Sequence, residues 1–181
     1  MCGAGGSTGK PAAADLLGPE IPHSRTGAQS AAAKMASAFG SEQMFSTTAR
    51  HQLLQVTVEP DQRSKLIQDT DTQYGPFTKQ LGLDTEGRPA AGATLVSRTM
   101  PAGTTIRSYT GSTADVDVWC ASLFGLTGAN VSKQIPVKEG WLTMTMSLRW
   151  TGDGWKLTAY TQKDGPQPTD QGAEFGAVPQ L

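Results

Sequence analysis

The sequence predicts an α+β domain in which three N-terminal helices pack on a curved antiparallel sheet. Apolar residues recur every three or four positions in the first half of the chain, which is typical of helices that bury one face. From Ala93 onward the period changes to two, and β-branched and aromatic residues become more frequent. With 181 residues, 37% of them hydrophobic, the chain has the size and the apolar content of one domain with its own core.

The first helix is expected to begin near Arg25, because Thr26 and Gln29 fit a capping box that satisfies the free backbone N–H groups of a first turn. Gly40-Ser41 should end it. Small apolar residues form its buried stripe, which would let the helix lie close to a sheet: Ala28, Ala31, Ala32, Met35, Ala38 and Phe39.

Two further helices are predicted before the sheet. One extends from about Ser46 to Val56, and the other begins at Pro60, since proline is well suited to the first turn of a helix. Gly75-Pro76 should end the latter, because proline lacks the backbone N–H that a helix interior requires.

The last hairpin gives the clearest strand pattern. Thr151 to Gly154 form a turn that makes Trp150 and Trp155 cross-strand partners on one face of the sheet. That face is apolar and contains Leu142, Met144, Met146, Leu148, Trp150, Trp155, Leu157 and Ala159. Earlier strands are expected over 95–109, with a break at Pro101 to Gly103, and over 114–124.

Both ends of the chain lack the apolar periodicity of a packed element. Residues 1–24 are predicted to be a flexible linker, 25–165 the domain, and 166–181 a mobile tail in which Phe175 is the lone aromatic residue. Cys2, followed by Gly, Ala and Ser, resembles the mature start of a bacterial lipoprotein, in which the cysteine carries the lipid and Met1 would stand in place of a removed signal peptide. A free cysteine in a tag-like tail is the alternative.

Composition argues against several classes of function. Fifteen basic and sixteen acidic residues give a net charge of −1, so the chain has no excess of positive charge that would attract nucleic acid. We therefore expect no nucleic-acid partner. The chain has no run of 18 apolar residues that would cross a bilayer. His23 and His51 accompany no nucleophile motif, and no cluster of acidic residues, His and Cys has metal-ligand spacing. We therefore expect no catalytic residue, no metal and no cofactor.

Trp and Gly positions of the second half carry a family resemblance. They lie in Val118-Trp119, Leu123 to Gly125, Gly140 to Met146, Leu148 to Trp150 and Gly154 to Leu157. With three preceding helices, this layout resembles the nuclear-transport-factor-2-like fold, a cone closed on one side by helices. Within that fold it resembles actinobacterial envelope proteins, which are similar to the periplasmic domains of conjugation and type IV secretion assembly factors. The resemblance implies an extracytoplasmic location and envelope proteins as partners. Those factors usually have an N-terminal membrane helix, whereas this chain has Cys2 and a linker.

Asp115 and Asp117 are the first pair of candidate site residues. Two positions apart on a strand, they project to one face, where mutual repulsion would raise one pKa if both lay in a pocket with Tyr109. Alternating Asp and Val is also the ordinary pattern of a half-exposed strand. Both interpretations stay open at this point.

Trp119 and Trp141 are the second pair, because both fall on the nominally polar faces of their strands. If the two strands are neighbours, these side chains form a surface patch or a pocket floor, and exposed aromatic residues are enriched at protein interfaces. Helices or loops that cover this face would be the alternative. Cys120, in an apolar run, is predicted to be a small core residue.

Two function classes follow from these candidates. The first is a non-enzymatic, membrane-tethered envelope subunit that assembles with other envelope proteins or with further copies of itself. The second is a small-ligand binder, or an isomerase- or cyclase-like enzyme, that uses the interior of the cone.

Overall fold

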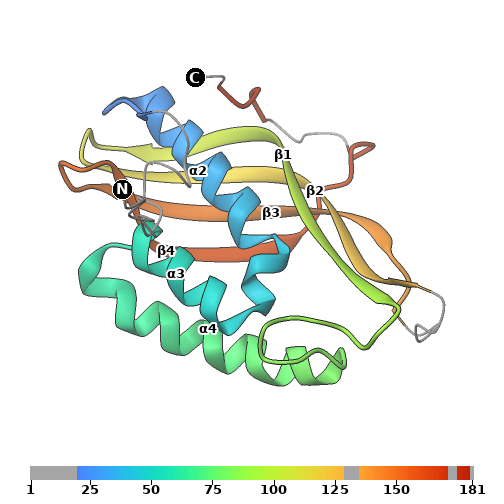
Figure 1. Cartoon of the computed structure of the whole chain (residues 1–181). Helices are drawn as coiled ribbons and strands as arrows, with labels where there is room; N and C mark the ends of the chain where they lie inside the picture. The colour runs from blue at the N-terminus through green and yellow to red at the C-terminus, as the bar shows by residue number, and fades with distance from the viewer. Residues whose placement is uncertain (1–19, 129–134, 171–174, 180–181) are drawn as a thin grey trace, which may run out of the picture.

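Three helices and a four-stranded antiparallel sheet form the α+β domain that the sequence predicts (Figure 1). The computed structural model describes residues 20–128, 135–170 and 175–179. The helices are α2 (Arg25–Phe39), α3 (Thr47–Thr57) and α4 (Pro60–Gln80), with a short 3₁₀ helix, η1 (Glu42–Phe45), between the first two. The strands are β1 (Ala93–Tyr109), β2 (Thr113–Gly128), β3 (Lys138–Trp150) and β4 (Trp155–Asp164).

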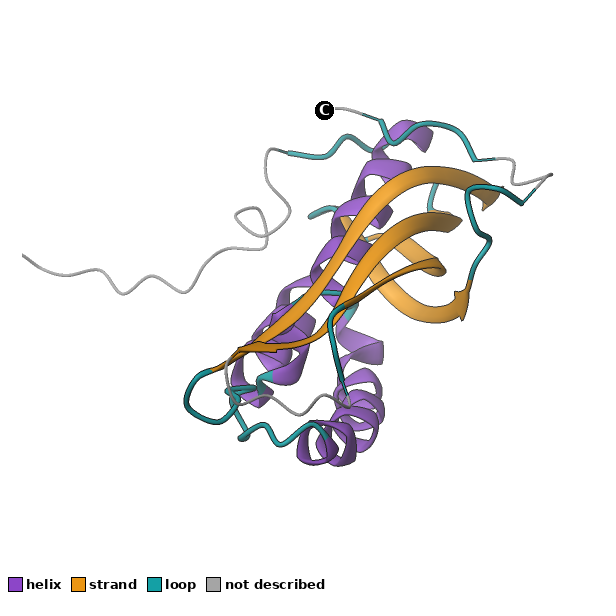
Figure 2. Cartoon of the chain, turned by 90° about the vertical axis from the view of Figure 1, so that its right-hand side faces the viewer, coloured by secondary structure: helices purple, strands orange, loops and turns teal. Residues whose placement is uncertain are grey.

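The sheet is an open meander in the order β1-β2-β3-β4, so β1 and β4 are its edges. Its strands curve, and the helices lie on one side of them (Figure 2). Among the described residues, no helix is long and apolar enough to cross a membrane.

The main core lies between α2 and the apolar face of β2, β3 and β4. Ala28, Ala32 and Met35 are fully buried against this face, where small side chains let the helix approach the sheet closely. The apolar hairpin residues Met144, Met146, Leu148, Trp155 and Leu157 are at most 2% exposed. The predicted pairing of Trp150 with Trp155 is confirmed.

The structure corrects the predicted position of Ala159 on the apolar face of that hairpin. The strand register shifts between Ser147 and Leu148, so Leu148 pairs with Leu157, whereas Ser147 pairs with Ala159. This bulge turns Ala159 to solvent and gives its predicted core position to Tyr160, which packs on Phe39 with ring centroids 5.0 Å apart.

Helix α2 begins at Arg25, as predicted, but with a different N-cap residue. Ser24, not Thr26, is the N-cap, and its Oγ accepts a hydrogen bond from the Gly27 backbone N–H at 2.9 Å. The Gln29 side chain donates to Thr104 Oγ1 at 3.0 Å instead of closing a capping box. The predicted capping box is therefore wrong, because a tertiary contact with β1 takes the Gln29 amide.

Helix α4 does not end at Gly75-Pro76, as the sequence predicted, but continues through Pro76 to Gln80. Its last turns pack on the aromatic ring of Phe45, which lies 5.2 Å from Tyr74 and 5.7 Å from Phe77. Leu81, directly after the helix, is buried in the same cluster. These contacts offset the backbone hydrogen bond that Pro76 cannot make.

The break predicted at Pro101 to Gly103 is a bulge inside one continuous strand. Pro101 pairs with Cys120 and Gly103 with Trp119, so Ala102 is the extra residue. A second register shift leaves Arg107 unpaired between Ile106 and Ser108.

Residues assigned by sequence to the two flexible ends contact the domain where the structure describes them. Ile21 is 9% exposed, and the Pro22 carbonyl accepts a hydrogen bond from Trp155 Nε1 at 3.2 Å. Gly176 pairs with Thr104 at the edge of β1. The packed part of the chain thus begins before Arg25. The mobility of 166–181 stays a prediction.

Candidate functional site

The candidate residues on β2 and β3 lie on the outer face of the sheet, the side turned away from α2. Val116, Val118 and Cys120 point into the core, so the alternating side chains Asp115, Asp117 and Trp119 point outward. This alternation confirms that the two carboxylates and Trp119 share one face.

Asp115 is held by hydroxyl groups from both neighbouring strands. Its Oδ2 accepts a hydrogen bond from Ser108 Oγ at 2.8 Å, and its Oδ1 accepts one from Ser147 Oγ at 2.6 Å. The carboxylate therefore ties β1 to β3 across β2.

Asp117 is held in the same manner but lies deeper. Its Oδ2 accepts from Arg107 Nε at 2.7 Å and its Oδ1 from Thr145 Oγ1 at 2.6 Å, and the Asp117 side chain is 11% exposed. The interpretation as a half-exposed strand therefore fits Asp115 better than Asp117. With both oxygens engaged, each carboxylate serves as a cross-strand tie.

Tyr109 does not join the carboxylates. It packs against the main core, 6.1 Å from the Trp155 ring, with the Arg25 guanidinium 5.9 Å from the centre of its own ring. Its partner across the sheet, Ala114, points into the core as well. The predicted grouping of Tyr109 with Asp115 and Asp117 is therefore not found.

Trp119 and Trp141 meet on the outer face, as expected if their strands are neighbours. Their rings stack with centroids 4.4 Å apart and planes inclined by 28°. Phe175 from the C-terminal segment stacks on Trp119 at 5.7 Å and 18°. We call these three residues, all half-buried, the outer aromatic cluster.

The C-terminal segment covers part of this cluster. After β4, Thr143 Oγ1 donates to the Gly165 carbonyl at 2.8 Å, and Trp119 Nε1 donates to the Pro166 carbonyl at 2.8 Å. Phe175 then returns to the same indole ring. The two interpretations of Trp119 and Trp141 thus both hold in part, since the aromatic patch exists and a loop covers some of it.

A cavity of about 590 Å³ lies on the other side of the sheet, between α4 and β4. Such a volume is within the range of small-molecule sites. Burial raises the pKa of Tyr74 and of Tyr160, so both phenols are protonated at neutral pH. The lining is mostly polar and uncharged: Gln62, Lys65, Leu66, Asp69, Thr70, Gln73, Tyr74, Thr158, Ala159, Tyr160, Thr161 and Gln162. It includes none of the pocket residues that the sequence suggested.

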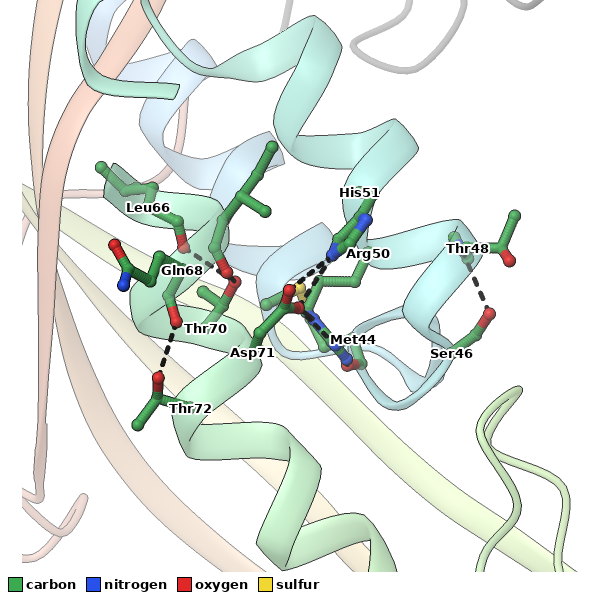
Figure 3. A network of polar contacts seen from close by, with 12 residues as sticks. Met44, Ser46, Thr48, Arg50, His51, Leu66, Gln68, Thr70, Asp71 and Thr72 are labelled. Atoms are coloured by element: carbon green, nitrogen blue, oxygen red, sulfur yellow. Dashed lines mark hydrogen bonds and ion pairs between the residues drawn. The ribbon is translucent and has the colours of Figure 1, made fainter. Parts of the chain in front are cut away.

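His51 belongs to a network that joins α3 to α4 (Figure 3). Asp71 Oδ1 lies 2.8 Å from His51 Nε2 and 2.7 Å from Nη2 of Arg50, whose side chain is 3% exposed. Arg50 also donates through Nη1 to the Met44 carbonyl at 2.7 Å. Burial raises the pKa of Asp71, but the hydrogen bonds from Arg50 and His51 outweigh it and hold the pKa below its usual value. The geometry of the contacts among Arg50, His51 and Asp71 is that of a structural tie between α3 and α4.

His23 is a second structural histidine. Its ring stacks on Trp150 with centroids 4.2 Å apart and planes inclined by 2°, and its Nε2 lies 2.5 Å from the Gly111 carbonyl oxygen. It therefore fastens the segment before α2 to the end of the hairpin.

The cysteines offer no reactive site within the described residues. Cys120 is fully buried, and burial raises the pKa of its thiol to about 12, so it is the predicted core residue. Cys2 lies outside the described residues. In 20–128, 135–170 and 175–179, no group of three or more His, Cys, Asp or Glu residues is placed to hold a metal ion.

Comparisons with known proteins add one structural likeness. No protein-family model and no curated protein matches the chain. Among solved structures, the chain is similar to the intermembrane space region of the chloroplast protein ARC6, with 18% identity and a TM-score of 0.47 over 81% of this chain and 100% of that one. A likeness at this level gives no argument about function.

Sequence analysis missed three parts of these sites: Phe175, Arg107 and the cavity residues. Phe175 had one signal, as the lone aromatic residue in an otherwise polar segment. Arg107 reaches Asp117 from a bulge, which no periodic pattern marks.

Proposed function

We propose that this protein is a non-enzymatic binding subunit of the cell envelope, which docks onto partner proteins through the outer aromatic cluster. The observation that carries the proposal is the stacked pair of Trp119 and Trp141 on the sheet face away from the helices. Tryptophan is enriched among the residues that dominate binding energy at protein interfaces. The carboxylates of Asp115 and Asp117 beside this pair, each hydrogen-bonded on both oxygens, support binding over catalysis.

The location rests on the sequence. Cys2 and the Gly-rich residues after it support a lipid-anchored, extracytoplasmic protein. The order of helices and strands is compatible with the nuclear-transport-factor-2-like resemblance, and hence with a role in a conjugation or secretion apparatus. We further propose that its partners are other envelope proteins or further copies of this chain, and that it does not bind nucleic acid.

Cross-linking in cells tests the proposal. The protein is expressed from its native gene in its own host, membranes are separated from cytosol, and cross-linked peptides are identified by mass spectrometry. Recovery in the membrane fraction with cross-links to envelope proteins is the expected result. A cytosolic monomer without partners would remove the support for this function.

A small-ligand site is the second candidate, favoured by the 590 Å³ cavity between α4 and β4. Gln, Thr and Tyr side chains there offer hydrogen bonds to an uncharged polar ligand. Replacing Gln73 with Leu would remove an amide from the lining and weaken such a ligand without affecting partner cross-links. Metabolites are screened by thermal shift against the wild type and against the Gln73→Leu variant. A metabolite that stabilises the wild type more than the variant would support the ligand site.

A further inference from the structure

We propose that Gly103, Thr104 and Trp119 form a peptide-acceptor site, which the chain's own Phe175-Gly176 occupies in place of a partner's segment. The inference rests on the proposed docking function and names the chemistry of the occupant. The partner would supply an extended segment with an aromatic residue followed by glycine or another small residue.

Main-chain pairing is the first element of recognition. Thr104 N–H donates to the Gly176 carbonyl at 2.7 Å, and Gly176 N–H donates to the Thr104 carbonyl at 2.9 Å. Thr104 lies on the edge strand β1, whose outer side faces no other strand of the sheet. An extended peptide adds to a sheet edge through such reciprocal pairs of hydrogen bonds. Because only main-chain groups take part, segments of many sequences can form them.

The aromatic residue is the second element, and Gly103 makes room for its Cβ atom and for the backbone that follows it. A Cβ atom at position 103 would lie 2.7 Å from Phe175 Cβ and 3.0 Å from the Gly176 carbonyl oxygen. Gly103 is not among the glycines with positive φ, so space and not backbone conformation explains the residue. The Phe175 ring then lies on Trp119, with centroids 5.7 Å apart.

The segment straddles the edge of β1. Phe175 lies on the outer face, and Val178 packs against the main core on the helix side. Ser30 Oγ of α2 lies 3.5 Å from the Pro179 carbonyl oxygen. Gly176 and Ala177 between these anchors are exposed, so the segment is an addition to a complete sheet and a competing segment can replace it.

Peptide binding to the full-length chain tests the proposal. The host is the Phe175→Ala variant, whose own segment lacks the ring, and the probe is a dye-labelled peptide with the sequence of residues 172–181. We expect this host to bind the peptide roughly tenfold more tightly than it binds the same peptide with Ala for Phe, because one aromatic stack is lost. Wild type should also bind the peptide more weakly than the variant does, since its own segment competes.

A second host locates the site. In the double variant Gly103→Ala/Phe175→Ala, the added methyl group would meet the Cβ atom of the bound aromatic or Ala residue and the carbonyl oxygen of the residue after it, so both peptides should bind this host more weakly than they bind the first host. The Trp119 indole N–H resonance, assigned by its loss in Trp119→Phe, should shift when peptide binds the first host. If Phe175→Ala does not fold, the same resonance in wild type at rising peptide concentration reports displacement.

Equal affinity for the two peptides, or equal binding by wild type and Phe175→Ala, would overturn the proposal. So would a wild-type dimer that Phe175→Ala converts to a monomer, because the segment would then belong to a second copy. The assay uses purified protein, so its failure is distinct from a failure to find envelope partners in cells.

Discussion

Asp117 accepts a hydrogen bond from Arg107 at 2.7 Å, across a bulge that brings this arginine over the neighbouring strand. One of the two carboxylates that the sequence suggested for a pocket is thereby engaged on one side, with Thr145 on the other. A group held on both oxygens fixes strand positions and is poorly placed for proton transfer.

Replacing Asp117 with Asn tests whether this carboxylate is a cross-strand tie. We expect unfolding free energy to fall by about 1–2 kcal/mol, because one charge-assisted hydrogen bond to a half-exposed arginine is lost. Partner cross-links should persist. Asp115→Asn, which loses only hydroxyl contacts, is the matched control and should cost less. An unchanged free energy of unfolding for Asp117→Asn would contradict the role of this carboxylate as a cross-strand tie.

Trp155 anchors the hairpin to the core and to the segment before α2. It is 1% exposed, and its Nε1 donates to the Pro22 carbonyl. Trp155→Ala should lower the free energy of unfolding by about 3–5 kcal/mol, measured by denaturant titration. Trp141→Ala, at a half-buried position, should cost less than half as much. A loss near zero for Trp155→Ala would mean that this ring is not in the core.

Asp69 and Asp71 on α4 provide a matched comparison of exposed and buried ion pairs. Asp71→Ala leaves the buried Arg50 charge with only the Met44 carbonyl and the Tyr74 ring, so we expect a loss of about 2–4 kcal/mol, moderated by the 40% exposure of the Asp71 side chain. Asp69→Ala removes the exposed pair with Lys65 and should cost about 0.5 kcal/mol or less. Similar losses for the two variants in urea titration would contradict this account.

Stability at low pH should depend on the same network. The folded-state pKa of Asp71 is below its unfolded value, so its contribution is present above pH ~4 and is lost as pH falls through the folded pKa. Asp71→Asn should therefore flatten the acid side of the stability profile, measured by thermal unfolding from pH 7 to pH 2. An unchanged acid slope would show that Asp71 is not the group that titrates.

Cys120 should be unreactive in the folded protein. Since its thiol has a pKa of about 12 and is fully buried, iodoacetamide at pH 8 should modify it only after unfolding. A Cys2→Ser background removes the other thiol, and intact mass spectrometry gives the extent of modification. Rapid labelling of the folded chain would mean that the core around Cys120 opens readily.

Much of this architecture could be predicted because it depends on local patterns. The two-residue period of β3 and β4 determined which side chains meet, and it placed Trp150 opposite Trp155. The continuation of α4 through Pro76 could not be predicted, because it depends on contacts with Phe45 from a distant element. The bulge at Thr158 likewise follows from strand pairing and not from periodicity, whereas the break predicted at Pro101 to Gly103 marked the place of the bulge at Ala102.

The candidate site divides in the same way. That Trp119 and Trp141 lie together follows from two adjacent strands whose faces can be read from the sequence. Phe175 could not be assigned, because nothing in its polar surroundings indicates which surface it would contact. The donors that saturate Asp117 also remained hidden, since Arg107 reaches it only through a bulge.

Site-specific photo-cross-linking is the most direct test of docking through the outer aromatic cluster. A photoreactive phenylalanine analogue is placed at Trp141 in the full-length protein in its own host, and at exposed Gln68 on α4 as the control. We predict that position 141 captures one or more envelope proteins under irradiation and that position 68 does not. Capture at position 68 alone, or at neither position in membranes that contain the protein, would contradict the claim.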